Sequence, residues 1–263
     1  MTNTARNSLI ERLYISTVSE DAVELSKSCG MGLEIAEYCT AYNMDEYLEE
    51  TDRTVRAEMA HTDRFVFHAP FNELCPAAID PKVLAITRER YEQAYRLCSS
   101  YGIRRMVCHS GYVPLVYFKT WFHDRSVEFW TDFLKDKPAD FTVCLENVLE
   151  DEPHMLTEIV KAVNDPRFLL CLDIGHANTF VSEIPLSQWI DVNGPYIGHL
   201  HIHNNEGGWD VHDPLPTGNI PMEETLNHLL SLVPDDTTIT LETLQSRSSV
   251  QWLMDHHFIE RRQ

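Results

Sequence analysis

A carboxylate and an imidazole stand three residues apart near the middle of the chain, immediately after an apolar segment. The segment spans residues 168–172 and stops at Asp173, which His176 follows. Such a continuous apolar run is typical of a parallel strand that is buried on both faces. Both side chains are common metal ligands, and a bound cation would account for two polar groups at a strand end. The alternative is that Asp173 caps the next turn and that His176 lies on the surface.

Polar residues end five other apolar segments in the same way, and two more stand in a later loop at residues 204–220. All of them are imidazoles or carboxylates, the ligands that suit Zn²⁺ and Mn²⁺. Five imidazoles and four carboxylates exceed what one ion can use, although carboxylates can bridge neighbouring ions. We therefore predict a divalent metal centre of Zn or Mn with more than one ion per chain, whose candidate ligands are His68, His109, Glu146, Asp173, His176, His201, Asp210, His212 and Glu242.

The elements that position these residues are strand-like and helix-like segments that alternate eight times. Strands are predicted at residues 13–16, 32–36, 64–67, 105–108, 141–145, 168–172, 196–203 and 237–241. Helices are predicted at residues 21–28, 44–59, 81–101, 121–135, 153–163, 185–192, 222–232 and 248–258. Without a linker or a break in composition, this α/β pattern predicts one (β/α)8 TIM barrel domain over residues 1–263. An open, doubly wound sheet is the alternative.

In a barrel, the carboxyl ends of all strands meet at one mouth, so the candidate ligands would converge there. Side chains that alternate along the seventh strand share one face. We interpret His199 as a hydrogen-bonded core residue beside His201, and His203 as a contact to substrate or a support for a ligand. For Glu34 a salt bridge is the alternative to a substrate contact, and packing is favoured for Trp121. The candidate substrate-binding residues are His203, Trp209, Tyr112 and Glu34.

Composition narrows the classes of partner. The 263 residues carry a formal net charge of −20, which opposes a large nucleic-acid surface because phosphate binding depends on clustered Lys and Arg. No apolar run reaches the about 20 residues that span a bilayer, so we expect no membrane partner. The polar residues 1–8 and seven cysteines without a Cys-x-x-Cys pair predict a reducing, cytoplasmic location. Cys108, Cys144 and Cys171 lie in apolar runs and are expected to be buried.

The motifs at the strand ends resemble the xylose-isomerase-like TIM-barrel superfamily over nearly the whole chain. This superfamily contains sugar and sugar-phosphate isomerases and epimerases, and also the endonuclease IV family, the family 2 AP endonucleases. The Asp-Ile-Gly-His motif, together with Asp-x-His and Glu-Thr, is the most specific part of the resemblance. The matching motifs are His68-Ala69-Pro70-Phe71, His109-Ser110-Gly111, Leu145-Glu146-Asn147, Leu172-Asp173-Ile174-Gly175-His176, His201-Ile202-His203-Asn204, Asp210-Val211-His212 and Leu241-Glu242-Thr243.

The epimerase branch implies one Mn²⁺-type ion on the residues that match Glu146, Asp173, His201 and Glu242. In that branch the two glutamates also exchange protons with the substrate, and the histidine that matches His176 contacts the sugar. The resemblance thus implies a metal-dependent isomerase or epimerase that acts on a small sugar or sugar-phosphate-like substrate through an enediolate. The implied catalytic residues are Glu146, Glu242 and His176. This chain lacks the arginine that these epimerases carry soon after the seventh-strand histidine.

The endonuclease IV branch implies instead that the full set of nine ligands holds three zinc ions, and here no ligand is missing. A polynuclear zinc phosphoesterase is therefore the alternative function. The loop at residues 204–220 contains no Lys or Arg, and the Gly-Glu-Gly turn of that family reads Pro216-Thr217-Gly218. We therefore expect a small-molecule substrate and no duplex DNA partner. A metal-storing or regulatory barrel is a third possibility, and a homo-oligomer is compatible with the sequence.

Overall fold

Eight parallel strands close into a barrel in the computed structural model, which describes residues 9–260. Each strand pairs with the next, and β1 pairs with β8, where Tyr14 lies opposite Thr240. This closure confirms the predicted (β/α)8 TIM barrel and excludes the open sheet. The strands are β1 (Leu13–Ser16), β2 (Gly32–Ile35), β3 (Phe65–His68), β4 (Arg105–His109), β5 (Thr142–Glu146), β6 (Phe168–Asp173), β7 (Ile197–Ile202) and β8 (Thr238–Leu241).

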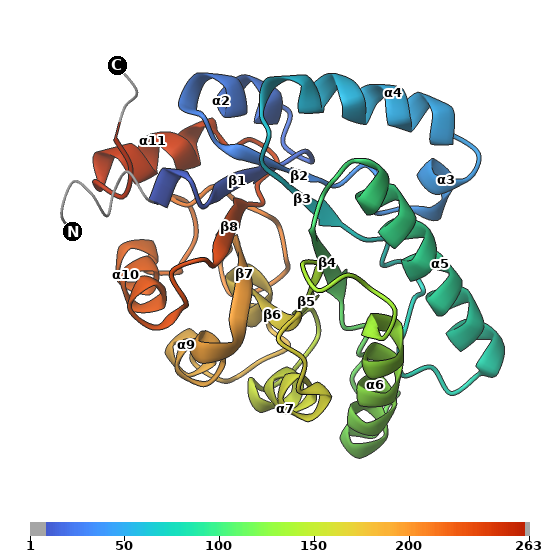
Figure 1. Cartoon of the computed structure of the whole chain (residues 1–263). Helices are drawn as coiled ribbons and strands as arrows, with labels where there is room; N and C mark the ends of the chain where they lie inside the picture. Colours follow the sequence, from blue (N-terminus) through green and yellow to red (C-terminus); the bar gives the residue numbers. More distant parts are fainter. Residues whose placement is uncertain (1–8, 261–263) are drawn as a thin grey trace.

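Helices follow the strands and surround the barrel (Figure 1). They are α2 (Ala22–Cys29), α3 (Ala41–Met44), α4 (Leu48–Glu58), α5 (Pro81–Ser100), α6 (Lys119–Leu134), α7 (His154–Val163), α8 (Ile174–Ala177), α9 (Leu186–Asn193), α10 (Met222–Leu232) and α11 (Arg247–Asp255), with 3-10 turns η1 (Met59–His61) and η2 (Gly194–Tyr196). Among the described residues, no helix is long and apolar enough to cross a membrane. The expectation of a cytoplasmic location drew on residues 1–8, which lie outside the described part.

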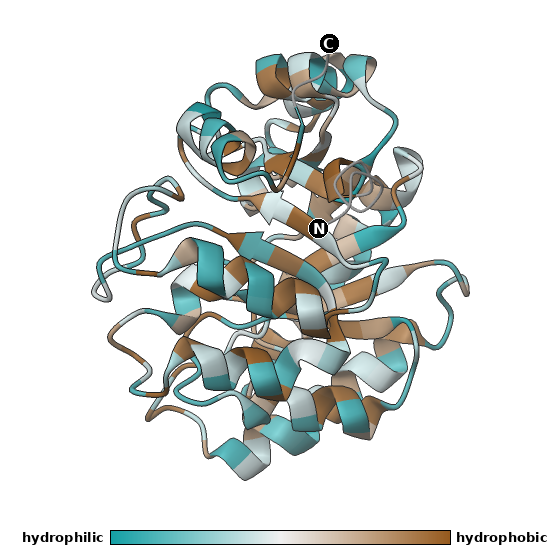
Figure 2. Ribbon diagram, turned by 90° about the vertical axis from the view of Figure 1, so that its left-hand side faces the viewer, coloured by the Kyte–Doolittle hydropathy of each residue, from teal (hydrophilic) through white to brown (hydrophobic). Residues whose placement is uncertain are grey.

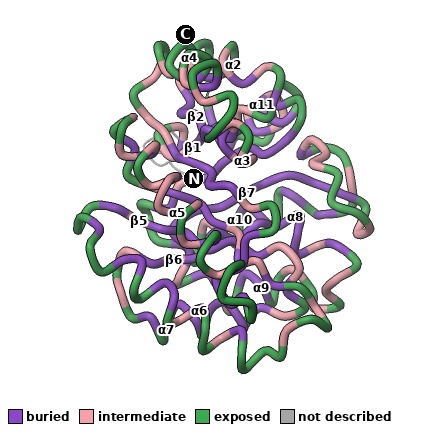
Figure 3. Tube along the Cα trace, turned by 90° about the vertical axis from the view of Figure 1, so that its right-hand side faces the viewer, coloured by how far each residue is buried: buried purple, intermediate pink, exposed green. Residues whose placement is uncertain are grey.

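The main core lies between the strands and the helices, because each amphipathic helix turns its apolar face inward. On α7, for example, Met155, Ile159 and Val163 are buried. Figure 2 shows hydrophobic residues concentrated on the strands, and Figure 3 shows the same strands buried while exposed residues lie on the outer helices and loops. The strands are therefore held rigidly, so side chains at their ends are held in fixed positions.

A second, smaller apolar cluster fills the lower interior of the barrel. It contains Tyr14, Val66, Val107, Cys144 and Cys171, all of which are buried. Because side chains alternate along a strand, the residue two positions further on also points inward. On β3 to β6 those residues are candidate ligands, so the apolar cluster lies directly beneath them. Cys108, Cys144 and Cys171 are buried, as predicted.

Two predicted helices differ from the structure. The helix expected over residues 44–59 begins only at Leu48 in α4, because Asp45, which follows the short helix α3, has a non-helical backbone and its carboxylate binds Arg90. The helix expected over residues 248–258 ends at Asp255, since His257 adopts a positive φ of 62°. The short helix α8 was not predicted, and Asp173 caps it by accepting a hydrogen bond from the His176 amide at 2.7 Å.

Candidate metal centre at the carboxyl end of the barrel

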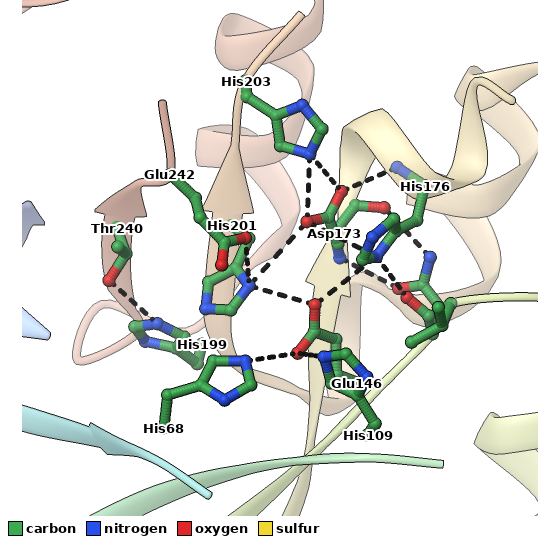
Figure 4. A network of polar contacts seen from close by, with 12 residues as sticks. His68, His109, Glu146, Asp173, His176, His199, His201, His203, Thr240 and Glu242 are labelled. Carbon is green, nitrogen blue, oxygen red and sulfur yellow. Dashed lines mark hydrogen bonds and ion pairs between the residues drawn. The ribbon is translucent and has the colours of Figure 1, made fainter. Parts of the chain in front are cut away.

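The nine predicted ligands converge at the carboxyl ends of the strands, and Figure 4 shows seven of them from close by. One group is formed by β3, β4 and β5. Nε2 of His68 and Nε2 of His109 each lie 3.4 Å from Oε2 of Glu146. His109 also stacks on Phe71, with ring centroids 4.2 Å apart, so its imidazole plane is fixed. One cation could contact the three side chains at once, since their ligand atoms lie within 4.8 Å of one another.

A central position is formed around Nδ1 of His201 on β7. This atom lies 3.1 Å from Oε1 of Glu146, 3.0 Å from Oε2 of Glu242 and 3.7 Å from Oδ2 of Asp173. His201, Asp173 and Glu146 are fully buried, and Glu242 is nearly so. Three carboxylates around one imidazole nitrogen form a donor set suited to a divalent cation.

The third group lies further out in the mouth and is formed by His176, Asp210 and His212. Oδ2 of Asp210 lies 3.1 Å from Nε2 of His176 and 2.8 Å from Nε2 of His212. Asp210 and His212 belong to the loop after β7. Hydrogen bonds of Asn204 stabilise the base of this loop. The backbone of Asn204 pairs with that of Asp213, and its side chain donates to the carbonyl of Leu215 at 3.0 Å.

Hydrogen bonds orient the imidazoles toward the carboxylates. Nδ1 of His68 contacts the carbonyl of Ala69 at 2.9 Å, and Nδ1 of His176 contacts that of Asn147 at 2.9 Å. Nδ1 of His212 contacts the carbonyl of Glu242 at 2.8 Å. Because a carbonyl oxygen only accepts, Nδ1 carries a proton in each of these rings. In the neutral imidazole, Nε2 then presents a lone pair to a carboxylate, an arrangement that an intervening cation stabilises.

Two further observations fit a cation. Oε2 of Glu146 and Oε2 of Glu242 are buried without a hydrogen-bond partner among the described residues, which is costly for a carboxylate. Burial opposes the ionisation of Glu146, but its electrostatic contacts with His201 and His109 and its hydrogen bonds with His176 and His201 outweigh burial and hold the Glu146 pKa well below its usual value. For Asp173, His176 and His203 outweigh burial and lower the pKa to about 2. Both carboxylates are therefore ionised at neutral pH and fit a metal ion.

Sequence reasoning did not single out Asn147 as a site residue. Its side chain joins β5 to β6, since Nδ2 donates to the carbonyl of Asp173 at 3.0 Å and Oδ1 accepts from the Asp173 amide at 2.9 Å. Its own carbonyl orients His176. The signal available in the sequence was its place directly after Glu146, where a polar residue again follows an apolar strand.

His203 lies under the mouth rather than on its surface. It is fully buried, and its Nε2 lies 3.1 Å from Oδ1 of Asp173. Its ring stacks on His212, with centroids 4.3 Å apart. It therefore contacts one candidate ligand from each of two groups. This position fits a support for Asp173, which was one of the two roles considered for His203.

The other candidate substrate-binding residues lie in different surroundings. Trp209 is 75% exposed at the mouth and packs edge-to-face on Phe180, with ring centroids 4.9 Å apart. Tyr112 is buried and packs on Phe122. Glu34 is fully buried below His201, with one oxygen 2.9 Å from Nε2 of that imidazole, so it does not line the mouth. Glu34 is therefore ion-paired, which was the alternative to a substrate contact.

His199 and Trp121 lie beside the site in the surroundings that the sequence favoured, a hydrogen-bonded core position and a packing position. His199 is fully buried and contacts both Glu34 and Thr238. Burial lowers the His199 pKa to about 4, so this imidazole is neutral at physiological pH. Trp121 donates from its indole nitrogen to the carbonyl of Ala77 at 3.0 Å, and it lies outside the ligand groups.

The closed barrel and this donor set define a xylose isomerase-like TIM barrel, and the model of that family matches residues 24–256. The chain therefore belongs to the xylose isomerase-like TIM barrel family. An uncharacterized protein of Methanocaldococcus jannaschii is 28% identical over 229 residues, covering 76% of this chain and 72% of that protein.

Solved structures show the same fold. A D-tagatose 3-epimerase-like protein is 24% identical, with a TM-score of 0.70 over 93% of this chain and 96% of its own. A Thermus thermophilus protein whose crystals were soaked with ZnCl2 is 23% identical, with a TM-score of 0.75 over 93% of this chain and 97% of its own. The fold is thus shared with an epimerase-like protein and with the Thermus thermophilus protein.

Proposed function

We propose that this protein is a divalent-metal-dependent isomerase or epimerase that acts on a small sugar or sugar-phosphate-like substrate through an enediolate. One observation carries the proposal. Glu146 and Glu242, from opposite parts of the barrel wall, both direct a carboxylate oxygen at Nδ1 of His201, at 3.1 and 3.0 Å. Two ionisable groups that converge on one metal position suit proton removal and proton return at adjacent carbons.

The residues of the centre take distinct roles. Glu146, Asp173, His201 and Glu242 would hold the central cation, which supplies Lewis-acid polarisation of a substrate carbonyl. Glu146 and Glu242 act as base and acid on the substrate. His176, at the inner side of the mouth, contacts substrate oxygens, and the exposed ring of Trp209 covers an apolar face of the sugar.

The cofactor is Zn²⁺ or Mn²⁺, with more than one ion per chain. Support comes from the donor types, from two groups of side chains whose ligand atoms lie within 4.8 Å of one another, and from the carboxylates around Nδ1 of His201. The fold shared with a D-tagatose 3-epimerase-like protein and with a protein soaked in ZnCl2 agrees with both parts of the proposal.

A polynuclear zinc phosphoesterase is the second candidate, and one observation favours it. The group of His176, Asp210 and His212 forms a separate compact donor set next to the central position. An isomerase needs only the central ion, whereas hydrolysis of a phosphoester uses neighbouring ions to hold the attacking and leaving oxygens.

Metal analysis and paired activity assays test the proposal. Protein purified without chelator is analysed for zinc and manganese, then assayed on a panel of ketoses, ketose phosphates and phosphodiesters. We expect more than one equivalent of metal and interconversion of a sugar that is lost on chelation and restored by Mn²⁺ or Zn²⁺. Metal-dependent hydrolysis of a phosphodiester without sugar interconversion would favour the second candidate, and protein without metal would contradict both.

A further inference from the structure

Glu34 is a buried carboxylate that reaches across the barrel interior from β2 to β7 and β8. Its Oε1 lies 2.9 Å from Nε2 of His201, and its Oε2 lies 2.9 Å from Nε2 of His199. The hydroxyl of Thr240 also donates to Oε2. Glu34, His199 and His201 each have no exposed surface, so water does not compete for these hydrogen bonds.

The support given to His201 differs from the support given to the other imidazoles. His68, His176 and His212 each donate from Nδ1 to a backbone carbonyl and direct Nε2 at a carboxylate. The two ring nitrogens of His201 have the opposite roles, because its Nε2 contacts Glu34 and its Nδ1 faces the central position. A carboxylate accepts a stronger hydrogen bond than a carbonyl does, so the central ligand has the strongest partner of the four.

We propose that Glu34 is a positioning residue that fixes His201 in the tautomer that binds the central metal through Nδ1. An ionised carboxylate can only accept, so a neutral His201 beside it carries its proton on Nε2 and its lone pair on Nδ1. The negative charge of Glu34 also makes Nδ1 a better donor to a cation. The contacts of Oε2 with His199 and Thr240 hold the carboxylate in place. This inference rests on the proposed metal centre.

Glu34, His68 and His201 also bring ligand atoms within 4.8 Å of one another, but we assign Glu34 to positioning rather than to metal ligation or substrate contact. Both of its oxygens are occupied, and it lies on the Nε2 side of His201, away from Glu146 and Glu242 on the Nδ1 side. A substrate in the mouth would meet the ligands first. The function of Glu34 must therefore act through His201.

The test is the affinity of the centre for Zn²⁺, measured on chelator-stripped protein by competition with a chromophoric chelator. Glu34→Gln removes the charge and leaves one acceptor for two imidazole donors. We expect one class of sites to bind Zn²⁺ about 10–100-fold more weakly, as is typical when the partner of a metal-bound histidine is lost, while the other sites keep their affinity. In the zinc-loaded wild type, ¹⁵N shifts should show His201 protonated at Nε2.

Glu150→Gln is the matched control. Glu150 is also a buried glutamate near the mouth, but among the described residues it binds the Ser110 hydroxyl and the Val148 amide and makes no hydrogen bond or ion pair with an imidazole. Its replacement by an uncharged side chain should leave Zn²⁺ affinity nearly unchanged. If Glu34→Gln does not fold, Thr240→Val, which removes one hydrogen bond from Glu34, should weaken the same class of sites by a few-fold.

The outcomes separate this inference from the metal centre itself. Wild-type protein that binds no Zn²⁺ would overturn the proposed centre. Wild-type protein that binds Zn²⁺, with equal affinity in Glu34→Gln or an equal loss in Glu150→Gln, would overturn the role of Glu34 and leave the centre standing. Unchanged affinity in Thr240→Val would count against the role of Glu34 in the same way.

Discussion

The backbone of Gly175 lies directly against the imidazole of His203. A β-carbon at residue 175 would come within 1.9 Å of Cε1 and 2.3 Å of Nε2 of that ring. Only a residue without a side chain allows His203 to reach Asp173 from beneath the mouth. The glycine of the Asp-Ile-Gly-His motif is thus explained by packing against a ring that is distant in sequence.

Gly175→Ala should therefore displace His203 and loosen Asp173. Overpacking of this kind costs about 1–3 kcal/mol of stability, and we expect the bound metal per chain to fall. Gly208→Ala is the control, because nothing lies within 4 Å of a β-carbon at that position. Metal content and thermal midpoint of the two variants check the prediction, and equal metal content in both would contradict it.

Glu242→Gln and Asp210→Asn separate the two candidate reactions. For an isomerase, Glu242→Gln should lower turnover by at least about 10²–10⁴-fold through the lost acid or base. Asp210→Asn should then cost little, since Asp210 belongs to the outer group. Turnover and metal stoichiometry are measured for both variants. A similar collapse in both, with an ion lost from Asp210→Asn, would identify a phosphoesterase.

The exposed ring of Trp209 predicts a contribution to substrate binding. Trp209→Ala should raise KM by about tenfold with little change in kcat, because a ring that only contacts the sugar binds ground state and transition state alike. Steady-state kinetics on the substrate that gives activity test this expectation. Trp121→Ala is a comparison outside the ligand groups, and an equal rise in its KM would argue against a specific contact.

The carboxylate pair of Glu37 and Glu58 predicts a pH dependence of stability. Burial and the adjacent Glu37 raise the pKa of Glu58 to about 8. The unfolded chain releases the Glu58 proton near pH 4.5 and the folded protein only near pH 8, so the stabilisation from protonated Glu58 falls between these pH values and is lost above about pH 8. Glu58→Gln should remove that loss.

Chemical denaturation at pH 5 and pH 9 checks the prediction. Glu58→Gln should match the wild type at pH 5 and exceed it by about 1 kcal/mol at pH 9, a modest gain because solvent screens this partly exposed pair. Glu46→Gln, at an exposed position, should show no such gain. An equal pH profile for wild type and Glu58→Gln would show that Glu58 ionises normally.

Charge predicts weak interaction with DNA. With a net charge of −20 and no Lys or Arg at residues 204–220, the protein should not bind an abasic duplex usefully at physiological salt. A gel-shift titration with such a duplex measures this. Sub-micromolar binding that weakens steeply with salt would show that a local basic surface outweighs the net charge.

The barrel was predictable from local pattern because buried parallel strands appear as apolar runs. Residues such as Asp173 and Glu146 then mark strand ends, and closure of the barrel brings them to one mouth. The start of α4 only at Leu48 was not predictable, since it depends on the contact of Asp45 with Arg90, far away in sequence.

The sequence suggested His203 as a support and an ion pair for Glu34, but it did not identify the partners of the supporting residues. Glu34 and His201 are 167 residues apart, and their contact exists only because the barrel closes. Phe180 packs on Trp209, and nothing in the sequence around residue 180 indicates this contact. Supporting residues of this kind follow no fixed spacing from the ligands, so no local pattern identifies them.

The two halves of the chain contribute unequally to the central position. Glu146, Asp173, His201 and Glu242 all belong to the half that forms β5 to β8, while Glu34 belongs to β2 in the other half. A fragment with only the later half would keep every central ligand and lose the carboxylate behind His201. With Glu34 in its proposed role, substitutions in the early half would change the metal affinity of the candidate centre while its ligand residues stay intact.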